Sequence, residues 1–248
     1  MIPFDDTWII HKKRKFEFGD DLAKRPTKKI KITSEPENKT TIYQIPLDKD
    51  EPKDHSQHSG NLIYSNDNHI YFYTVINNRS ITMLQKEVQN VINKIIKKSK
   101  SAENLGFTIV YPPIVLHINS PGGNVFASFK FIDYMTQIKR KFPEIKFHSI
   151  VEGLVASAAT FISVTADKRF ITEYGYMLIH QLWSCSFGKY NELKDDVSNC
   201  DILMERIKNI YRKHAKIPNN QLDEILKHDL YWDSKTCKKY KLVDIILN

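Results

Sequence analysis

Ser157 lies in a stretch of small residues that directly follows an expected strand, Glu152-Gly153-Leu154-Val155-Ala156-Ser157-Ala158-Ala159-Thr160. A serine at the start of a helix suits nucleophilic chemistry, because the amides of the first helical turn can stabilise an oxyanion. Small neighbours also let a substrate backbone approach. The alternative is a packing role, since stretches rich in Ala and Ser usually mark close contacts between helices. The stretch is not the G-x-S-x-G turn of the α/β-hydrolases, because glycine is absent two positions on either side of Ser157.

Two further side chains could act with this serine. His180 ends the apolar run Met177-Leu178-Ile179-His180-Gln181, and Asp229 precedes an aromatic pair in His228-Asp229-Leu230-Tyr231-Trp232. Taken singly, each has a structural explanation: a half-buried, hydrogen-bonded histidine and an aspartate at a turn or helix end. Taken together with Ser157, they supply a hydroxyl, an imidazole and a carboxylate, the groups of nucleophilic acyl transfer.

A pair of glycines ends another expected strand, in His117-Ile118-Asn119-Ser120-Pro121-Gly122-Gly123-Asn124-Val125. The chain has only eight glycines among its 248 residues, so two adjacent ones indicate backbone that needs unusual dihedral angles or a close approach by another chain. A plain turn between a strand and a helix is the alternative.

The hydrophobic pattern predicts the elements that must position these residues. Apolar runs predict strands at 69–75, 114–118, 146–151, 169–172 and 176–179. Apolar residues at helical spacing predict helices at 80–98, at about 126–135, from Gly153 to about Thr165, and at about 189–214. Strands and helices therefore alternate along the chain, which predicts an α/β domain at residues 61–248.

Residues 1–60 differ from the rest of the chain. They are polar, contain Pro26, Pro36, Pro46 and Pro52, and show no sustained apolar period, which predicts a disordered extension. The extension carries two basic clusters, HKKRK at 11–15 and KRPTKKIKI at 24–32. Nuclear import or an anionic surface is one use of such clusters, and a solvated tail is the other reading.

Composition narrows the class of protein. The net charge of +8 is spread over the chain without the basic-aromatic pattern of RNA-binding modules, so a nucleic-acid partner is not expected. Three cysteines, Cys185, Cys200 and Cys237, are too few and too scattered for a disulfide framework or a zinc site, which favours a reducing compartment. We expect a cytoplasmic protein, since no apolar run approaches the roughly 18 residues of a membrane span and the N-terminus, MIPFDDTWII, is unlike a signal peptide.

The motifs together resemble those of the ClpP family, the proteolytic subunits of Clp proteases. The family places its nucleophile in a Gly-x-Ala-Ala-Ser segment, here Gly153 to Ser157, and its base in a Met-x-x-His-Gln segment, here Met177 to Gln181. The run from Ile118 to Gly123 and the later Tyr240-Lys241-Leu242-Val243-Asp244 also resemble the family. The resemblance covers about residues 65–248.

The resemblance implies a fold, a site and an assembly. The fold would be the ClpP/crotonase-like stack of β-β-α units, with the helix at about 189–214 as a protruding handle. Ser157, His180 and Asp229 would form the catalytic triad, and the amides of Gly123 and Ala158 the oxyanion hole. Gly122 and Gly123 would bind the substrate as an added strand. No metal or organic cofactor is implied.

The implied assembly is a homo-oligomer of two stacked heptameric rings. A hexameric AAA+ ATPase would feed unfolded polypeptides into its chamber.

The chain also departs from the family. Leu182 stands where proline usually follows His-Gln, the glycine-rich strand before the handle is missing, and Ala158 and Lys241 replace the usual Met and Gly. Residues 99–113 resemble an insertion, and the extension is longer than the family's short axial loops. Two alternatives therefore stay open: a non-catalytic ClpP-like ring or regulatory subunit, and a crotonase-type acyl-CoA enzyme. Relatives of signal-peptide peptidase, which use Ser-Lys chemistry, are a more distant third.

Overall fold

The computed structural model describes residues 27–32, 41–46, 62–103 and 111–247 of the chain. The chain divides into two compact units, Met1–His58 and Ser59–Asn248. In the first unit, β1 (Thr27–Ile32) and β2 (Thr41–Pro46) pair antiparallel, with Thr27 opposite Pro46 and Ile32 opposite Thr41. The first basic cluster lies outside the described residues, as does most of the extension that is expected to be disordered. That expectation stays a prediction.

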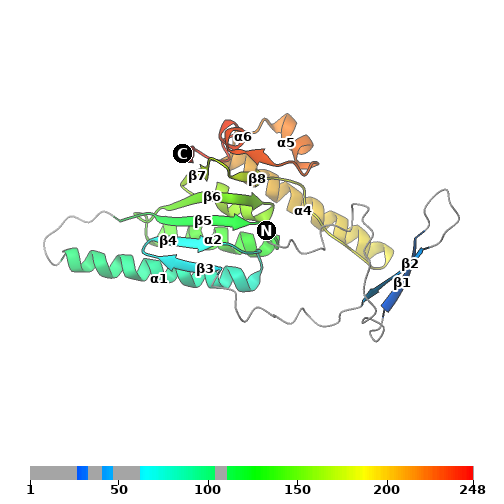
Figure 1. Cartoon of the computed structure of the whole chain (residues 1–248), viewed down its shortest axis with the longest axis horizontal. Coiled ribbons are helices and arrows are strands. Elements are labelled where there is room, and N and C mark those ends of the chain that lie inside the picture. The colour runs from blue at the N-terminus through cyan, green and yellow to red at the C-terminus, as the bar shows by residue number, and fades with distance from the viewer. Residues whose placement is uncertain (1–26, 33–40, 47–61, 104–110, 248) are drawn as a thin grey trace. The chain divides into compact units, whose positions relative to one another are not determined.

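The second unit is built on a mostly parallel sheet (Figure 1). Among the described residues its strands follow the order β10-β7-β6-β5-β4-β3, with β8 paired to β6 and β9 paired to β8. Of the strand pairs described in this sheet, β3–β4 and β8–β9 are antiparallel and the others are parallel. The strands are β3 (Ile63–Asn66), β4 (His69–Phe72), β5 (Ile114–Ser120), β6 (Phe147–Ala156), β7 (Lys168–Thr172), β8 (Tyr176–Leu178), β9 (Trp232–Asp233) and β10 (Ile245–Leu247).

The described helices of this unit are α1 (Asn78–Glu103), α2 (Val125–Lys141), α3 (Ala158–Val164), α4 (Tyr190–His214), α5 (Asn219–Leu226) and α6 (Ser234–Lys239). Four of them, α1 to α4, correspond to predicted helices, and α5 and α6 were not predicted. Helix α1 contacts β3 and β4, α3 contacts β5 and β6, and α2 packs against both helices. The predicted α/β class is confirmed. None of the described helices combines the length and the hydropathy that a membrane crossing requires.

The two faces of the sheet differ in chemistry. Ile70 and Phe72 of β4 and Leu116 of β5 point to the helix-covered core and are buried. The residues between them in the sequence, such as Tyr71 and His117, point to the other face, because successive side chains of a strand alternate. The core is thus one-sided, and the second face carries aromatic and titratable groups.

Strand β6 corrects one prediction. The small residues from Gly153 onward were expected to be helical, but β6 continues to Ala156 and α3 begins only at Ala158. The first half of β6 pairs with β7 and its last three residues pair with β8. Gly153 lies between the two halves with φ +63°, a conformation in which glycine lets the strand change neighbours. The strand therefore delivers Ser157 to the end of the sheet.

Two other expected segments have partial outcomes. The expected insertion at 99–113 is helical at its start, since α1 runs to Glu103, and residues 104–110 lie outside the described ranges. The long helix predicted at about 189–214 is α4, which extends away from the sheet (Figure 1).

Candidate active site

Ser157 joins β6 to α3 in a strained conformation. Its dihedral angles are φ 52° and ψ −129°, which an L-amino acid rarely adopts. The amide of Ser157 donates to the carbonyl of Leu178 (2.8 Å), and its carbonyl accepts from the amide of Thr160 (2.9 Å). Ser157 occupies the N-cap position of α3, yet its hydroxyl makes no capping hydrogen bond. The hydroxyl is thus available for another partner, although a serine at this position usually caps its helix.

The glycine turn after β5 lies directly against this serine. A Cβ on Gly122 would lie 2.7 Å from the Cβ of Ser157 and 2.6 Å from the carbonyl oxygen of Ala156. A Cβ on Gly123 would lie 2.2 Å from the carbonyl oxygen of Ile76. Both glycines have positive φ, 96° and 138°. Any side chain here would therefore collide with backbone, which explains the glycine pair that the sequence places after β5.

The segment after β4 holds the turn in place. Ile76 donates its amide to the carbonyl of Gly122 (2.7 Å) and accepts from the amide of Asn124 (2.8 Å). Asn124 then caps α2 through its side chain, which accepts from the amide of Ala127. The turn is bonded on both sides, so its backbone is fixed before any ligand arrives.

Two backbone amides beside the serine have no acceptor among the described residues. One is the amide of Gly123, which lies between the two bonds to Ile76. The other is the amide of Ala158, the first residue of α3, where helical amides lack an intrahelical partner. A Cβ on Gly122 would lie 3.1 Å from the Ala158 nitrogen, so the turn and the helix start are adjacent. Unpaired amides at such a place can bind an anionic oxygen.

His180 and Asp229 are hydrogen-bonded to each other although 49 residues separate them. His180 Nδ1 lies 2.8 Å from Asp229 Oδ1. The amide of Gln181 donates to the carbonyl of Leu226 (2.6 Å), which draws the segment after β8 to the end of α5. The side chain of His180 is 11% exposed and that of Asp229 is 70% exposed.

The His180–Asp229 pair sets the tautomer of the imidazole. An ionised carboxylate only accepts hydrogen bonds, so Nδ1 of His180 carries the proton that it shares with Asp229. In the neutral imidazole this leaves the lone pair on Nε2, the nitrogen that can take up a proton from a nucleophile.

The structure brings the sequence-predicted residues together in two groups. Gly122 and Ala158 lie beside Ser157, Gly123 follows Gly122 in the same turn, and His180 pairs with Asp229. The groups are adjacent through the sheet, because Ala156 of β6 pairs with Leu178 of β8. Among the described residues, no hydrogen bond joins the Ser157 hydroxyl to the His180 imidazole. The triad as a connected unit therefore stays a prediction.

Sequence reasoning missed the hydroxyl groups beneath the site. Ser128 of α2 donates to the carbonyl of Ala158 (2.7 Å), and Thr160 donates through Oγ1 to the carbonyl of Ser157 (2.6 Å). Tyr211 of α4 reaches the same Thr160 oxygen. No motif marks these residues. Ser128 and Tyr211 act through groups far away in the sequence, and the bond from Thr160 to a carbonyl three residues earlier is an ordinary feature of helices.

A second polar cluster lies on the face of the sheet opposite α1, α2 and α3, on β4, β5 and β6 and just after β4. His69 Nδ1 lies 2.8 Å from His117 Nε2, and His117 Nδ1 lies 2.6 Å from Glu152 Oε1. Tyr73 donates to the other oxygen of Glu152. Burial, together with the nearby His117, lowers the pKa of His69, and burial with the bond to Glu152 raises the pKa of Tyr73. Within the described ranges, no group of three or more His, Cys, Asp or Glu side chains is arranged to hold a metal ion.

Comparisons with known proteins bear on residues 65–248, which match the family model described as Clp protease. The chain is 27% identical over 171 residues to "ATP-dependent Clp protease proteolytic subunit 2" of Borreliella burgdorferi. The aligned region covers 68% of this chain and 82% of that relative. It is 26% identical over 184 residues to the protein of the same name from Treponema denticola, covering 73% of this chain and 88% of the relative.

Proposed function

The chain belongs to the Clp protease family, and on this premise we propose that it is a serine endopeptidase that hydrolyses peptide bonds of unfolded proteins. The observation that carries the proposal is the surroundings of Ser157. Its hydroxyl is not used in capping, and it lies against Gly122. The strand beside it, β8, is followed by His180, which pairs with Asp229. Apart from water and the substrate, the steps below use only groups of this chain.

In the proposed reaction, Ser157 Oγ attacks the carbonyl carbon of the scissile peptide bond. His180 takes the serine proton on Nε2 as the new C–O bond forms, and Asp229 stabilises the imidazolium through Nδ1. The amides of Gly123 and Ala158 would donate to the oxyanion of the tetrahedral intermediate.

The intermediate then breaks down in two stages. His180 returns its proton to the leaving amine as the C–N bond breaks, which leaves an ester on Ser157. A water molecule attacks this ester with His180 again as base, and the carboxylic acid product leaves with the hydroxyl of Ser157 restored.

The substrate would bind as an extended strand. The glycine turn presents backbone without side chains beside Ser157, so a peptide can approach closely enough for main-chain hydrogen bonds. Such binding recognises the backbone of the substrate more than its side chains, and it requires that this segment of the substrate be unfolded. This fits a protease that accepts many sequences once they are unfolded.

We further propose that the protein works as a homo-oligomer, two stacked heptameric rings that enclose the sites, with a hexameric AAA+ ATPase as unfoldase. Two features support this assembly. The relatives from Borreliella and Treponema are named as subunits of an ATP-dependent protease. The N-terminal half of α4 exposes apolar side chains, among them Tyr190 (71% exposed) and Val197 (63% exposed), which a neighbouring copy could cover.

A non-catalytic ring subunit is the second candidate. The observation in its favour is that the described residues include no hydrogen bond between Ser157 and His180. In that case the fold and the assembly would be kept while the chemistry is performed by another subunit.

One experiment separates the two candidates. The assembled wild type is treated with a fluorophosphonate probe and assayed on a fluorogenic peptide, beside Ser157→Ala and the matched control Ser198→Ala on the exposed side of α4. For a peptidase, wild type and Ser198→Ala are labelled and hydrolyse the peptide, Ser157→Ala does neither, and mass spectrometry finds the probe on Ser157. An unlabelled, inactive wild type beside a well-labelled control protease contradicts the peptidase and supports the non-catalytic subunit.

A further inference from the structure

A buried chain of hydroxyl groups leads from α4 to the backbone of Ser157. Tyr211 Oη lies 2.7 Å from Thr160 Oγ1, and Thr160 Oγ1 lies 2.6 Å from the carbonyl oxygen of Ser157. Thr160 and Tyr211 are both fully buried. The ring of Phe161 packs edge-on against that of Tyr211, with 5.8 Å between the centroids. The path from the helix to the serine is therefore enclosed in protein.

The donor in each of these hydrogen bonds follows from the single hydrogen that each hydroxyl group carries. A threonine hydroxyl has one hydrogen, and Thr160 uses it to donate to the Ser157 carbonyl, which can only accept. Tyr211 must then be the donor to Thr160. Burial raises the pKa of the Tyr211 phenol, which keeps that proton in place. Donors arranged in series polarise one another, so the last bond in the chain is strengthened by the first.

The carbonyl at the end of this chain belongs to the peptide unit that carries the amide of Ala158. A peptide unit is planar, so a group that fixes the direction of the Ser157 C=O also fixes the direction of the Ala158 N–H. The carbonyl accepts twice from Thr160, from its amide at 2.9 Å and from its hydroxyl at 2.6 Å. The hydroxyl chain thus controls the orientation of one proposed oxyanion donor.

This control matters because the backbone here is strained. The positive φ of Ser157 is energetically unfavourable, and such a conformation persists only where its surroundings over-determine it. The bond from the Ser157 amide to Leu178 holds one side of the residue, and Thr160 holds the other.

We infer that Thr160 and Tyr211 are positioning residues for the peptidase reaction: through the Ser157 carbonyl they aim the Ser157–Ala158 peptide unit at the developing oxyanion. The inference rests on the proposed function. It assigns to the C-terminal half of α4 a role in the chemistry, in addition to its packing against α3.

The test uses the full assembled protein and variants that each remove one part of the chain. Tyr211→Phe deletes only the phenol oxygen, Thr160→Val replaces the hydroxyl with a methyl group of similar size, and Thr160→Ser keeps the hydroxyl. The matched control is Ser149→Ala, because Ser149 also donates from β6 to a carbonyl of α3, that of Ser163 at 3.0 Å, in another buried hydroxyl pair. The measurements are kcat and KM for a peptide, the rate of fluorophosphonate labelling, and the free energy of unfolding.

The expected result is a loss in kcat with KM little changed. Complete loss of an oxyanion donor lowers kcat by about 100-fold to 1,000-fold, and a misdirected donor should cost less, about 10-fold to 100-fold in Thr160→Val. Tyr211→Phe should fall between that variant and the wild type, and Thr160→Ser should recover most of the rate. The double variant Tyr211→Phe with Thr160→Val should be no slower than Thr160→Val, because Tyr211 acts only through Thr160. Ser149→Ala should unfold more easily and keep its kcat.

Other outcomes overturn the inference in distinguishable ways. If Thr160→Val and Tyr211→Phe lose stability as Ser149→Ala does but hydrolyse peptide at the wild-type kcat, the hydroxyl chain is only structural and the proposed function stands. If the wild type is neither labelled nor active, the proposed function fails and this inference fails with it. If Thr160→Val does not fold, the kcat of Tyr211→Phe decides, since that variant loses a single buried atom.

Discussion

Ser157 has a positive φ, which is unfavourable for any residue with a side chain and persists only where the surrounding structure constrains it. The constraint consists of named bonds, to Leu178 on one side and to Thr160 on the other. The same conformation turns the Ser157 hydroxyl away from capping α3. The start of α3 is less stable without a side-chain cap. In return, the Ser157 hydroxyl has no competing hydrogen-bond partner in the described part of the protein.

At the scale of single residues, we predict that Asp229→Asn lowers kcat for peptide hydrolysis by about 10,000-fold, the loss typical of this change in Ser-His-Asp peptidases. An asparagine amide can donate to Nδ1 of His180, which moves the imidazole proton to Nε2 and leaves no base for Ser157. Steady-state kinetics on a fluorogenic peptide measure the loss.

The matched control for this change is Asp233→Asn, four residues further along. Asp233 caps α6 by accepting from the amide of Thr236, and asparagine caps equally well, so this variant should keep its kcat. A loss of less than tenfold in Asp229→Asn would show that the carboxylate does not orient the base.

The sequence motifs identified the residues of the candidate site but not the buried hydroxyl groups that hold its backbone. Gly122 and Ser157 are 35 residues apart in the numbering, and the structure places them in contact. The pairing of His180 with Asp229 could likewise be anticipated from the motifs that contain them. Thr160 and Tyr211 could not. A threonine hydroxyl bonded to the carbonyl three residues before it is an ordinary feature of helices and marks no site, and Tyr211 reads in the sequence only as one more position of an apolar stripe.

At the scale of elements, the C-terminal strand is fastened to the sheet by a bidentate ion pair. Arg169 of β7 donates from Nη2 to Asp244 Oδ1 (2.7 Å) and from Nε to Oδ2 (3.0 Å). The Arg169 side chain is 12% exposed and that of Asp244 is 28% exposed. Asp244 precedes β10, so the pair fixes where that strand joins β7.

We predict that Asp244→Asn lowers the free energy of unfolding by about 3 kcal/mol at pH 7, because it leaves a largely buried guanidinium without its carboxylate. Urea unfolding measures the change. The control is Asp67→Asn, which removes an exposed ion pair with Lys98 and should change stability by less than about 0.5 kcal/mol.

The same pair predicts a dependence on pH. The hydrogen bonds from Arg169 hold the pKa of Asp244 below its usual value of 3.8. A carboxylate whose pKa is lowered by folding stabilises the folded state above its unfolded pKa, and this stabilisation is lost as the pH falls through the folded pKa. The difference in stability between wild type and Asp244→Asn should therefore shrink below about pH 4. A difference that stays constant down to pH 2 would contradict this account.

The longer elements were predictable, the short elements α5, α6, β9 and β10 were not predicted, and the misplaced start of α3 has a physical cause. Small residues such as Ala156 and Ala158 favour a helix by propensity, yet Ala156 lies in β6 because it pairs with Leu178 of β8. Pairing between strands depends on residues far apart in the sequence, and it overrides local preference. Strand β3 was missed because its four residues show no distinctive pattern.

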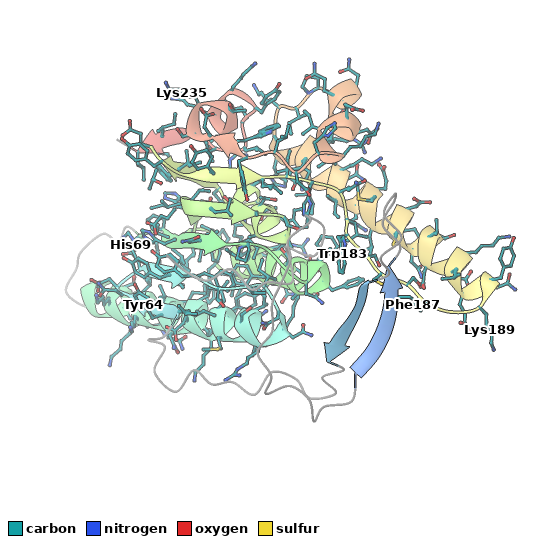
Figure 2. The ribbon with its side chains drawn as sticks, turned by 45° about the vertical axis from the view of Figure 1, so that its right-hand side comes forward. Tyr64, His69, Trp183, Phe187, Lys189 and Lys235 are labelled. Atoms are coloured by element: carbon teal, nitrogen blue, oxygen red, sulfur yellow. The ribbon has the colours of Figure 1, made fainter. Side chains whose placement is uncertain are left out.

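At the scale of the whole molecule, α4 has an apolar stripe that is only half covered. Towards its C-terminus the stripe is buried at Ile207 and Tyr211, and towards its N-terminus the same face is exposed at Tyr190 and Val197. Figure 2 shows Lys189 at the end of α4 far from the sheet, with Trp183 and Phe187 on the segment that leads there. Trp183 (77% exposed) and Phe187 (91% exposed) add to the uncovered apolar area. Surfaces of this kind usually mark contacts with another protein.

We predict that Val197→Glu reduces the assembly to a smaller species, because a buried, unpaired carboxylate at a contact between copies is strongly unfavourable. Native mass spectrometry on equal concentrations measures the change. Asn199→Glu places the same charge on the opposite side of the helix and should leave the mass of the assembly unchanged. Equal masses for wild type and Val197→Glu would exclude this part of α4 from the interface.

The face of the sheet opposite α1, α2 and α3 makes the protein sensitive to mild acid. His69 and His117 face each other through ring nitrogens that hold one proton between them, and Glu152 fixes which nitrogen has it. Burial and the nearby His117 keep the pKa of His69 in the folded protein below 6.5, its value in an unfolded chain. Just below pH 6.5, His69 is therefore protonated in the unfolded state but still neutral in the folded state. As the pH falls further, the folding equilibrium shifts towards the unfolded state until His69 is protonated in the folded protein as well. We therefore expect the free energy of unfolding to decrease as the pH falls below about 6.5, by the contribution of this one histidine.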